Sequence, residues 1–150
     1  MKLSTRVRYA TRALVVLARC QEPCTSETIA QAERLSKKYM DEILGALRQG
    51  GILHTKRGVS GGYTLAVPLA EISLLRVAEL LDGPVVLAPC VDDETICPRQ
   101  AVCLMGPVWA QLNDAVRDSF AAVSMKAIVE EGEVCLPAVS APAGLCSRKR

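Results

Sequence analysis

The stretch "LSKKYMDEILGALRQGGILHTKRGVSGGYTLAV", Leu35 to Val67, changes its hydrophobic period midway. Its first part carries an apolar stripe at helical spacing, formed by Met40, Ile43, Leu44 and Leu47. Ser36 can cap this helix, and Gly50 and Gly51 can stop it. Two β-prone runs, "ILHT" and "YTLAV", follow and are joined by the basic, glycine-rich "KRGVSGG". The stretch therefore predicts a helix and then a β-hairpin with a basic tip.

Two more helices are predicted upstream. Ser4 can cap the first, in which apolar residues recur at helical spacing: Val7, Ala10, Leu14 and Leu17. The second is short, with Thr25 or Ser26 as its cap and an end near Glu33, and only "RLS" separates it from the third. This order of elements forms a winged helix-turn-helix. Such a unit places its third helix in a DNA major groove and its wing along the backbone or the minor groove.

Charge is divided unevenly along the chain, although the formal net charge is only +2. Residues 1–60 hold 11 Lys and Arg against 5 Asp and Glu, whereas residues 61–147 hold 4 against 11. The N-terminal part is therefore the one suited to a polyanion. An uneven but merely solvated surface is the alternative explanation of this charge pattern when it is taken alone.

DNA contacts are expected from the third helix and from the hairpin tip. Cations, an aromatic hydroxyl and free backbone N–H groups meet at the start of the helix, where they suit phosphates. Asp41 can accept from a cytosine amino group and Arg48 can reach phosphate or guanine, although an ordinary solvated face is the alternative for the acidic residue. The wing glycines are weak evidence alone, since hairpin turns need glycine for positive φ. The expected DNA-binding residues are Lys37, Lys38, Tyr39, Asp41, Arg48, Lys56, Arg57 and Ser60.

The chain turns helical again beyond Pro68. Ser73 can cap "LLRVAELLDG", which we expect to pack on the first helix. Gly106 and Pro107 open a long helix with an apolar stripe of Trp109, Leu112, Val116, Phe120 and Val123. Such a stripe suits packing along another helix, either its own copy in a dimer or the core of the same chain. "SMKAIVEE" predicts a short capped helix.

The predicted fold class is mainly α with a small β-hairpin wing, a winged helix-turn-helix plus a long C-terminal dimerisation helix. We expect a DNA-binding domain over residues 1–67 and a cysteine loop with dimerisation helices over residues 68–131. Residues 132–150 are rich in Ala, Pro, Ser and Gly, which predicts a flexible tail.

The chain has seven cysteines, an odd number, and its basic N-terminus is followed by only six apolar residues, too few for a signal peptide. No apolar run approaches the roughly 20 residues of a membrane span. We therefore expect a cytoplasmic protein with reduced thiols and no membrane partner. Three of the thiols are grouped in "CVDDETICPRQAVC", with six and five residues between them. These gaps lack the CxxC clips of zinc ribbons, so a loop would have to wrap any metal.

Several stretches together resemble the Rrf-type bacterial transcription regulators. They are "MKLSTRVRYATRAL", "LSKKYMDEILGALRQGGIL", the wing "RGVSGGY" and the cysteine segment before a Trp-bearing helix, and the similarity extends over residues 1–131. The resemblance implies a homodimer that binds palindromic operators in double-stranded DNA and is held by the long C-terminal helix. It also implies that Cys90, Cys97 and Cys103 hold a [2Fe-2S] or [4Fe-4S] iron-sulfur cluster.

Thiolates are preferred ligands of iron in such clusters, and three of them leave one iron position for a weaker or exchangeable ligand. A cluster of this kind is easier to lose or attack, which suits a sensor of iron-sulfur, redox or nitrosative state. We expect cluster binding to fold the loop and so to set the relative orientation of the two recognition helices. Loss, oxidation or nitrosylation of the cluster would then change the affinity for the operator, whether the protein acts as a repressor or as an activator.

The chain departs from the family's pattern at the fourth ligand. The histidine of cluster-assembly regulators is replaced by Gly106, and the aspartate of nitric-oxide sensors by Arg8. The substitutes that stay open are Asp92, Asp93, Glu94, Cys20, Cys24, Cys135 and Cys146. For the sole histidine, His54, a surface or turn role is favoured over metal ligation.

Three alternatives remain open. The chain can be a cluster-free winged-helix regulator that senses by thiol oxidation or through a partner protein. It can also be an interaction module stabilised by zinc. An enzyme of thiol-disulfide exchange would want a CxxC in a βαβ setting, and the chain has neither. We therefore expect no catalytic activity.

Overall fold

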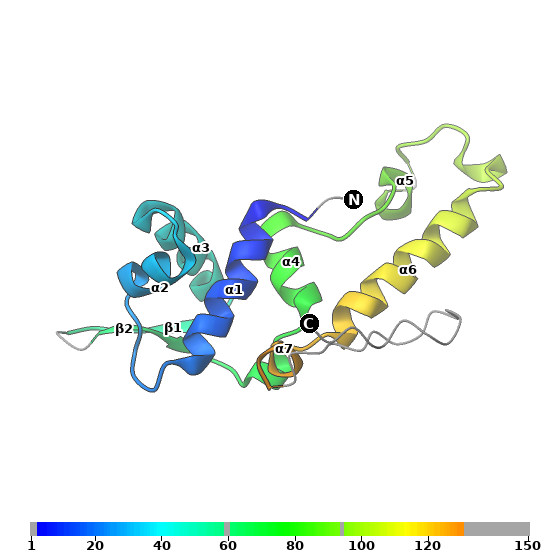
Figure 1. Ribbon diagram of the computed structural model, residues 1–150. Coiled ribbons are helices and arrows are strands. Elements are labelled where there is room, and N and C mark those ends of the chain that lie inside the picture. The colour runs from blue at the N-terminus through cyan, green and yellow to red at the C-terminus, as the bar shows by residue number, and fades with distance from the viewer. Residues whose placement is uncertain (1–2, 59–60, 94, 131–150) are drawn as a thin grey trace.

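The computed structural model describes residues 3–58, 61–93 and 95–130, in which helices dominate beside one two-stranded sheet. The elements are α1 (Thr5–Arg19), α2 (Ser26–Glu33), α3 (Lys37–Gln49), β1 (Leu53–Lys56), β2 (Gly62–Leu65), η1 (Leu69–Glu71), α4 (Leu74–Asp82), α5 (Pro89–Asp92), η2 (Gln100–Val102), α6 (Gly106–Ala122) and α7 (Met125–Glu130). Figure 1 shows α1–α3 and the hairpin gathered on one side, while α5 and the start of α6 extend to the other. The predicted winged-helix fold is confirmed. The predicted tail, residues 132–150, lies outside the described residues.

The first three helices begin where capping residues were expected. The hydroxyls of Ser4, Thr25 and Ser36 each accept a hydrogen bond from a backbone N–H three residues later, over 3.1, 3.1 and 3.3 Å. Of the two caps considered for the second helix, Thr25 is the one used. Each cap satisfies one of the N–H groups that a helix start leaves without an intrahelical acceptor.

The connection between α2 and α3 is a tight left-handed turn. Arg34 has φ 54° and ψ 44°, a conformation that is uncommon for a residue with a side chain. The N–H of Leu35 donates to the carbonyl of Ala30 over 2.9 Å, which closes the end of α2. The chain therefore turns directly into α3, and α2 and α3 pack against each other as in a helix-turn-helix.

The two-stranded hairpin also carries an isolated bridge that the sequence pattern did not predict. β1 and β2 pair antiparallel, with Leu53 opposite Leu65, and His54 lies exposed on β1. On the other edge of β2, the N–H of Cys24 donates to the carbonyl of Tyr63 over 3.0 Å, and the N–H of Tyr63 donates back over 2.8 Å. The wing is thereby attached to the segment that precedes α2.

The wing glycines are required for two different reasons. Gly58 has φ +113°, a backbone conformation that favours glycine. By contrast, a Cβ on Gly61 would lie 2.5 Å from the carbonyl oxygen of Lys56, and one on Gly62 would lie 2.7 Å from that of Cys24. At Gly61 and Gly62, therefore, the close approach of another backbone requires glycine, and the expectation from turn conformation explains only Gly58.

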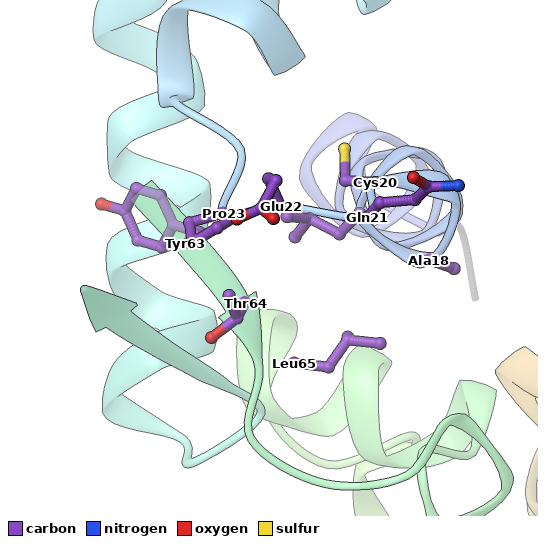
Figure 2. A pocket seen from close by; sticks show the side chains of 9 residues that line it. Ala18, Cys20, Gln21, Glu22, Pro23, Tyr63, Thr64 and Leu65 are labelled. Carbon is purple, nitrogen blue, oxygen red and sulfur yellow. The ribbon is translucent and has the colours of Figure 1, made fainter. Parts of the chain in front are cut away.

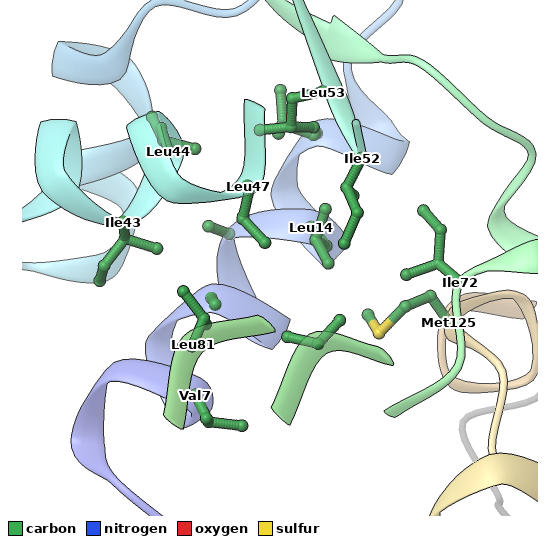
Figure 3. Packing of buried hydrophobic residues seen from close by; sticks show 14 of the residues in the cluster. Val7, Leu14, Ile43, Leu44, Leu47, Ile52, Leu53, Ile72, Leu81 and Met125 are labelled. Atoms are coloured by element: carbon green, nitrogen blue, oxygen red, sulfur yellow. The ribbon is translucent and has the colours of Figure 1, made fainter. Parts of the chain in front are cut away.

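One hydrophobic cluster joins α1, α3, α4, the wing and α7. In Figure 3, Leu14 of α1 faces Leu47 of α3 and Ile52. Each of these side chains is fully buried, which stabilises the fold by roughly 1.5–3 kcal/mol per side chain before entropy costs. α4 packs on α1, as predicted.

The chain returns to this cluster at α7. Met125 is fully buried, and its N–H donates to the carbonyl of Ile72 over 2.8 Å. The N–H of Leu74 donates to the carbonyl of Val123 over 2.8 Å, so the start of α4 and the start of α7 hold each other. The expected short helix after Ser124 is confirmed. The division of the chain at residues 67 and 68 stays a prediction.

The apolar stripe of α6 packs within its own chain toward the end of the helix and is exposed near the start. Val116 and Phe120 pack against the core of the same chain. Trp109 and Leu112, nearer the start of the helix, are 38% and 46% exposed. Within the ranges that the structure describes, no helix is long and apolar enough to cross a bilayer.

Candidate DNA interface and cysteine loop

The start of α3 presents cations beside free backbone donors. Lys37 and Lys38 are its first two residues, and both are exposed. The first turn of a helix has N–H groups without intrahelical acceptors, and Ser36 satisfies only the one at Tyr39. The helix dipole adds positive potential at the same end. The arrangement can bind a phosphate group.

Lys37 and Asp41 form an ion pair one turn apart, with Nζ and Oδ2 separated by 2.7 Å. The hydrogen bond to Asp41 raises the pKa of Lys37 above its ordinary value. In return, hydrogen bonds from Lys37 and from the Ser26 hydroxyl lower the pKa of Asp41. Asp41 is therefore ionised at neutral pH, and part of its acceptor capacity is used before any base is contacted.

Tyr39 takes part in a cluster that joins the first three helices. Its ring meets that of Tyr9 on α1 edge to face, with centroids 6.2 Å apart and planes at 87°. The Arg12 guanidinium carbon lies 5.6 Å from the centroid of the Tyr9 ring, and Arg12 also pairs with Glu33 of α2. Tyr39 is only partly exposed, so it has a packing role beside its predicted contact with phosphate.

The remaining predicted DNA-binding residues lie at the other end of α3 and on the wing. Arg48 is exposed in the last turn of α3, and Lys56 and Arg57 are exposed where β1 enters the hairpin turn. Ser60 lies outside the described residues. The structure thus gathers Lys37, Lys38, Tyr39 and Asp41 at one helix end and places two cations on the wing. Their contact with DNA stays a prediction.

Two residues beside α3 were not among the predicted ones. Ser26 was considered only as a helix cap, yet its hydroxyl acts on Asp41. Tyr63 of β2 lies near enough to Lys37 to contribute to the shift of its pKa. Tyr63 also lines a pocket between the end of α1 and β2, which Figure 2 shows. The sequence signal for Tyr63 was its place in "RGVSGGY", directly after the two glycines.

The three loop cysteines lie on different short segments. Cys90 is in α5, Cys97 is in the turn before η2, and Cys103 directly follows η2. Each is half-buried and has a free thiol. In the part of the chain that the structure describes, no three side chains of His, Cys, Asp or Glu come together as a group that could hold a metal. The predicted ligands are therefore near one another in sequence but are not gathered into a site.

One hydrogen bond ties the segment just before the loop to α6. The N–H of Leu87, just before α5, donates to Oδ1 of the buried Asn113 over 2.9 Å. Within the loop, Nε2 of Gln100 donates to the carbonyl of Cys90 over 3.4 Å, while Oε1 of Gln100 is buried without a hydrogen-bond partner. A change in the loop would therefore act on α6.

The substitutes for a fourth ligand are scattered. Asp92 and Asp93 are exposed, and hydrogen bonds from Thr95 lower the pKa of Asp93. Cys20 and Cys24 lie beside the wing, and Figure 1 shows the α1–α2 connection far from α5. Within one chain, neither of these thiols can complete a site in the loop. Three other substitutes lie outside the described residues: Glu94, Cys135 and Cys146.

Residues 3–131 match a protein-family model, Rrf2, described as an iron-dependent transcriptional regulator. The match includes the helix-turn-helix, the wing, the cysteine loop and α6.

Individual proteins are similar over nearly their whole length. The protein rrf2 of Nitratidesulfovibrio vulgaris is 30% identical over 137 residues, which are 90% of this chain and 91% of that protein. The transcriptional regulator IscR of Photorhabdus laumondii is 28% identical over 136 residues, with 89% and 82% covered. The solved structure of CymR (YrzC), the global cysteine regulator of Bacillus subtilis, has a TM-score of 0.71 at 26% identity, with 87% and 98% covered.

Proposed function

Because the chain belongs to the Rrf2 family of transcriptional regulators, we propose that it binds a double-stranded DNA operator as a homodimer and that its cysteine loop adjusts operator affinity. The chain is a DNA-binding regulator and not an enzyme, since the relatives that it matches are transcriptional regulators. We place its action in the bacterial cytoplasm, where the chromosome lies.

The start of α3 is the observation that carries the DNA-binding proposal. Lys37 and Lys38 stand exposed beside free N–H groups of the first turn, where they would fix the protein on the phosphates. Arg48 would reach a base edge or phosphate from the same helix, and Lys56 and Arg57 would follow the backbone from the wing. Asp41 would accept from a cytosine amino group while it keeps its bond to Lys37.

The exposed part of α6 supports the homodimer. The apolar side chains without a cover in the single chain include Val108, Trp109 and Leu112 of α6, and Met105 directly before it. Several large apolar residues together on one helix end are typical of an interaction surface. A second copy packed along this part of α6 would cover them, and two-fold symmetry would present two α3 helices to a palindromic operator.

The donor set of the loop fits an iron-sulfur cluster in its chemistry, since Cys90, Cys97 and Cys103 are three free thiols in one segment. Two observations support the cluster: the three thiols themselves and the description of the family as iron-dependent. The geometry of the loop adds no support, since the described part of it does not gather the thiols. When bound, a cluster would supply a group that is sensitive to iron supply, oxidation and nitric oxide.

A chain of contacts would connect the loop with the DNA-binding helix. Asn113 of α6 holds the backbone before the loop through Leu87. One turn later, Arg117 of α6 pairs with Glu79 of α4. On α4, Nη2 of Arg76 lies 3.5 Å from the carbonyl oxygen of Gly50 at the end of α3. A rearranged loop would thus act on α3 through α6 and α4.

A cluster-free regulator is the second candidate function. The scattered loop thiols and the similarity to CymR, the global cysteine regulator of Bacillus subtilis, both favour it. In that case Cys90, Cys97 and Cys103 would respond by oxidation, or the loop would be held by a partner protein. The three thiols would then react with alkylating agents in the purified protein.

The test is the content of iron, acid-labile sulfide and zinc per chain after purification without oxygen. The proposal expects iron with matching sulfide in the wild type and their loss in Cys97→Ala. Zinc without sulfide would point to a zinc-stabilised module. If the protein holds neither iron nor zinc, even after reconstitution with iron and sulfide, the cluster is excluded and the cluster-free regulator remains.

A further inference from the structure

Gln100 is hydrogen-bonded to the backbone of each of the three loop cysteines. Its N–H donates to the carbonyl of Cys97 over 3.0 Å, and its carbonyl accepts from the N–H of Cys103 over 3.2 Å. Its side chain reaches the third cysteine, since Nε2 donates to the carbonyl of Cys90 over 3.4 Å. Gln100, the first residue of η2, is therefore the residue that connects the three thiol-bearing segments of the loop.

One atom of the Gln100 side chain has no partner. Its Oε1 is buried, and no donor in the described part of the chain bonds to it. A buried acceptor without a donor is costly, so folded proteins satisfy nearly all such atoms. The partner of Oε1 would then come from outside the chain, as a water or a metal ion.

The Gln100 amide lies against the start of α6. A Cβ on Gly106, the first residue of that helix, would lie 4.0 Å from Nε2 of Gln100. Residue 106 has no side chain, so it leaves the amide its place at this helix end. α6 in turn pairs with α4 through Arg117 and Glu79. A bond that the amide makes or loses would therefore act on the helix that leads from the loop toward the DNA-binding domain.

We propose that Oε1 of Gln100 is the fourth ligand of the iron-sulfur cluster, beside Cys90, Cys97 and Cys103. This inference rests on the proposed function, because it adds a residue to the same site. Backbone hydrogen bonds tie Gln100 to Cys97 and Cys103, so its side chain moves with both thiols when the loop closes around a cluster. Three thiolates and one neutral amide oxygen would then hold the iron.

The chemistry of an amide oxygen suits an exchangeable ligand. It is harder than a thiolate and carries no charge, so it binds the iron of a cluster more weakly. A neutral fourth ligand also limits the negative charge around the cluster, which favours a higher reduction potential. When the amide leaves, it opens one iron to a small incoming ligand while the three thiolates keep their bonds.

The loop carboxylates that the structure describes are less suited to this position. Asp92 and Asp93 are both exposed. Oδ1 of Asp93 also accepts hydrogen bonds from the N–H and the hydroxyl of Thr95, over 2.9 and 2.6 Å. By contrast, Oε1 of Gln100 is buried and makes no hydrogen bond within the described ranges. It can bind a metal without giving up a bond of its own.

The test compares the wild type with Gln100→Ala and Gln100→Glu, each purified without oxygen and reconstituted with iron and sulfide. Iron and acid-labile sulfide per chain and the rate of iron transfer to EDTA are measured. Gln100→Ala should lose iron at least about tenfold faster than the wild type. Gln100→Glu should lose iron no faster than the wild type, because it keeps an oxygen ligand. Its reduction potential should be lower, because the carboxylate adds a negative charge.

Gln100→Glu also separates ligation from positioning. A glutamate has no N–H to donate to the carbonyl of Cys90, so a residue that only positioned Cys90 through this bond would make both variants equally labile. Asp93→Asn is the matched control at another loop position, and it should lose iron at the wild-type rate.

Three results would overturn the assignment of Gln100. They are a wild-type rate of iron loss in Gln100→Ala, equal lability of the two Gln100 variants, and a loss from Asp93→Asn as fast as that from Gln100→Ala. A wild type that holds neither iron nor sulfide after reconstitution would instead exclude the cluster itself, and this ligand with it.

Discussion

Cys24 and Tyr63 exchange two backbone hydrogen bonds, over 3.0 Å from the N–H of Cys24 and 2.8 Å from that of Tyr63. The pair forms a bridge on the outer edge of β2. Because Cys24 also directly precedes the cap of α2, the bridge makes the wing and the helix-turn-helix one structural unit. The orientation of the wing relative to α3 therefore depends in part on the α1–α2 connection.

Gly62→Ala should destabilise the protein by about 1–3 kcal/mol, because its Cβ would lie 2.7–2.9 Å from backbone atoms of Cys24. The free energy of unfolding in urea measures the effect. Gly45→Ala on α3 is the control, since a Cβ there meets nothing within 4 Å. It should raise the free energy of unfolding by about 0.5–1 kcal/mol through helix propensity. Equal stability of both variants would contradict the close approach at Gly62.

Two substitutions at Tyr39 should separate its packing role from its contact with DNA. Tyr39→Ala removes the edge-to-face contact with Tyr9 and should lower the free energy of unfolding by about 2 kcal/mol. Tyr39→Phe keeps the ring and should unfold like the wild type, but should bind all DNA sequences more weakly without its hydroxyl. Unchanged DNA affinity in Tyr39→Phe would restrict the residue to packing.

Lys37→Ala should weaken binding to every DNA sequence and reduce the dependence of log affinity on log salt by about 0.9, the value of one phosphate contact. A salt titration of operator and random DNA measures both. Removing Lys37 also leaves the Asp41 carboxylate without its ion-pair partner. The double variant with Asp41→Asn removes this negative charge as well, so its comparison with Lys37→Ala separates the effect of the lost cation from that of the unpaired carboxylate.

Lys126→Ala is the matched control for Lys37. Lys126 is likewise exposed and pairs with the carboxylate four residues later, at 3.7 Å, but it lies on α7. Its removal should leave the salt dependence unchanged. If both variants had the wild-type slope, Lys37 would not contact phosphate.

Leu112→Glu should convert the dimer into monomers, because it places a charge among the exposed apolar residues of α6. Sedimentation velocity measures the state. Gln111→Glu, on the neighbouring exposed position, should leave the dimer intact. A monomeric wild type, or a dimeric Leu112→Glu, would exclude this part of α6 as the interface.

Much of the fold could be predicted from local signals. Caps at Ser4, Ser36 and Ser73, the stop at Gly50 and the change of period after α3 are decided by residues close in sequence. The bridge between Cys24 and Tyr63 could not be predicted in this way. It joins residues distant in sequence, and one residue has no period to reveal a strand.

The candidate site was predictable to the same degree. Cations at a capped helix start are readable from sequence, so the place of Lys37 and Lys38 at the start of α3 was predicted, whereas their neighbours Ser26 and Tyr63 were not. Those two reach α3 only through tertiary packing. The spacing of cysteines likewise predicts a common segment, whereas the positions of the thiols depend on tertiary packing, such as that of α5 on α6.

The most direct test of the central claim is the affinity of anaerobically reconstituted protein for DNA that the wild type selects from a random pool, measured for the wild type and for Cys97→Ala. We predict that the selected sequences share a palindrome and that the two proteins differ in affinity for it by at least about tenfold. Selection without a sequence preference would contradict a DNA-binding regulator. A shared palindrome bound equally by both proteins would contradict control of operator affinity by the cysteine loop.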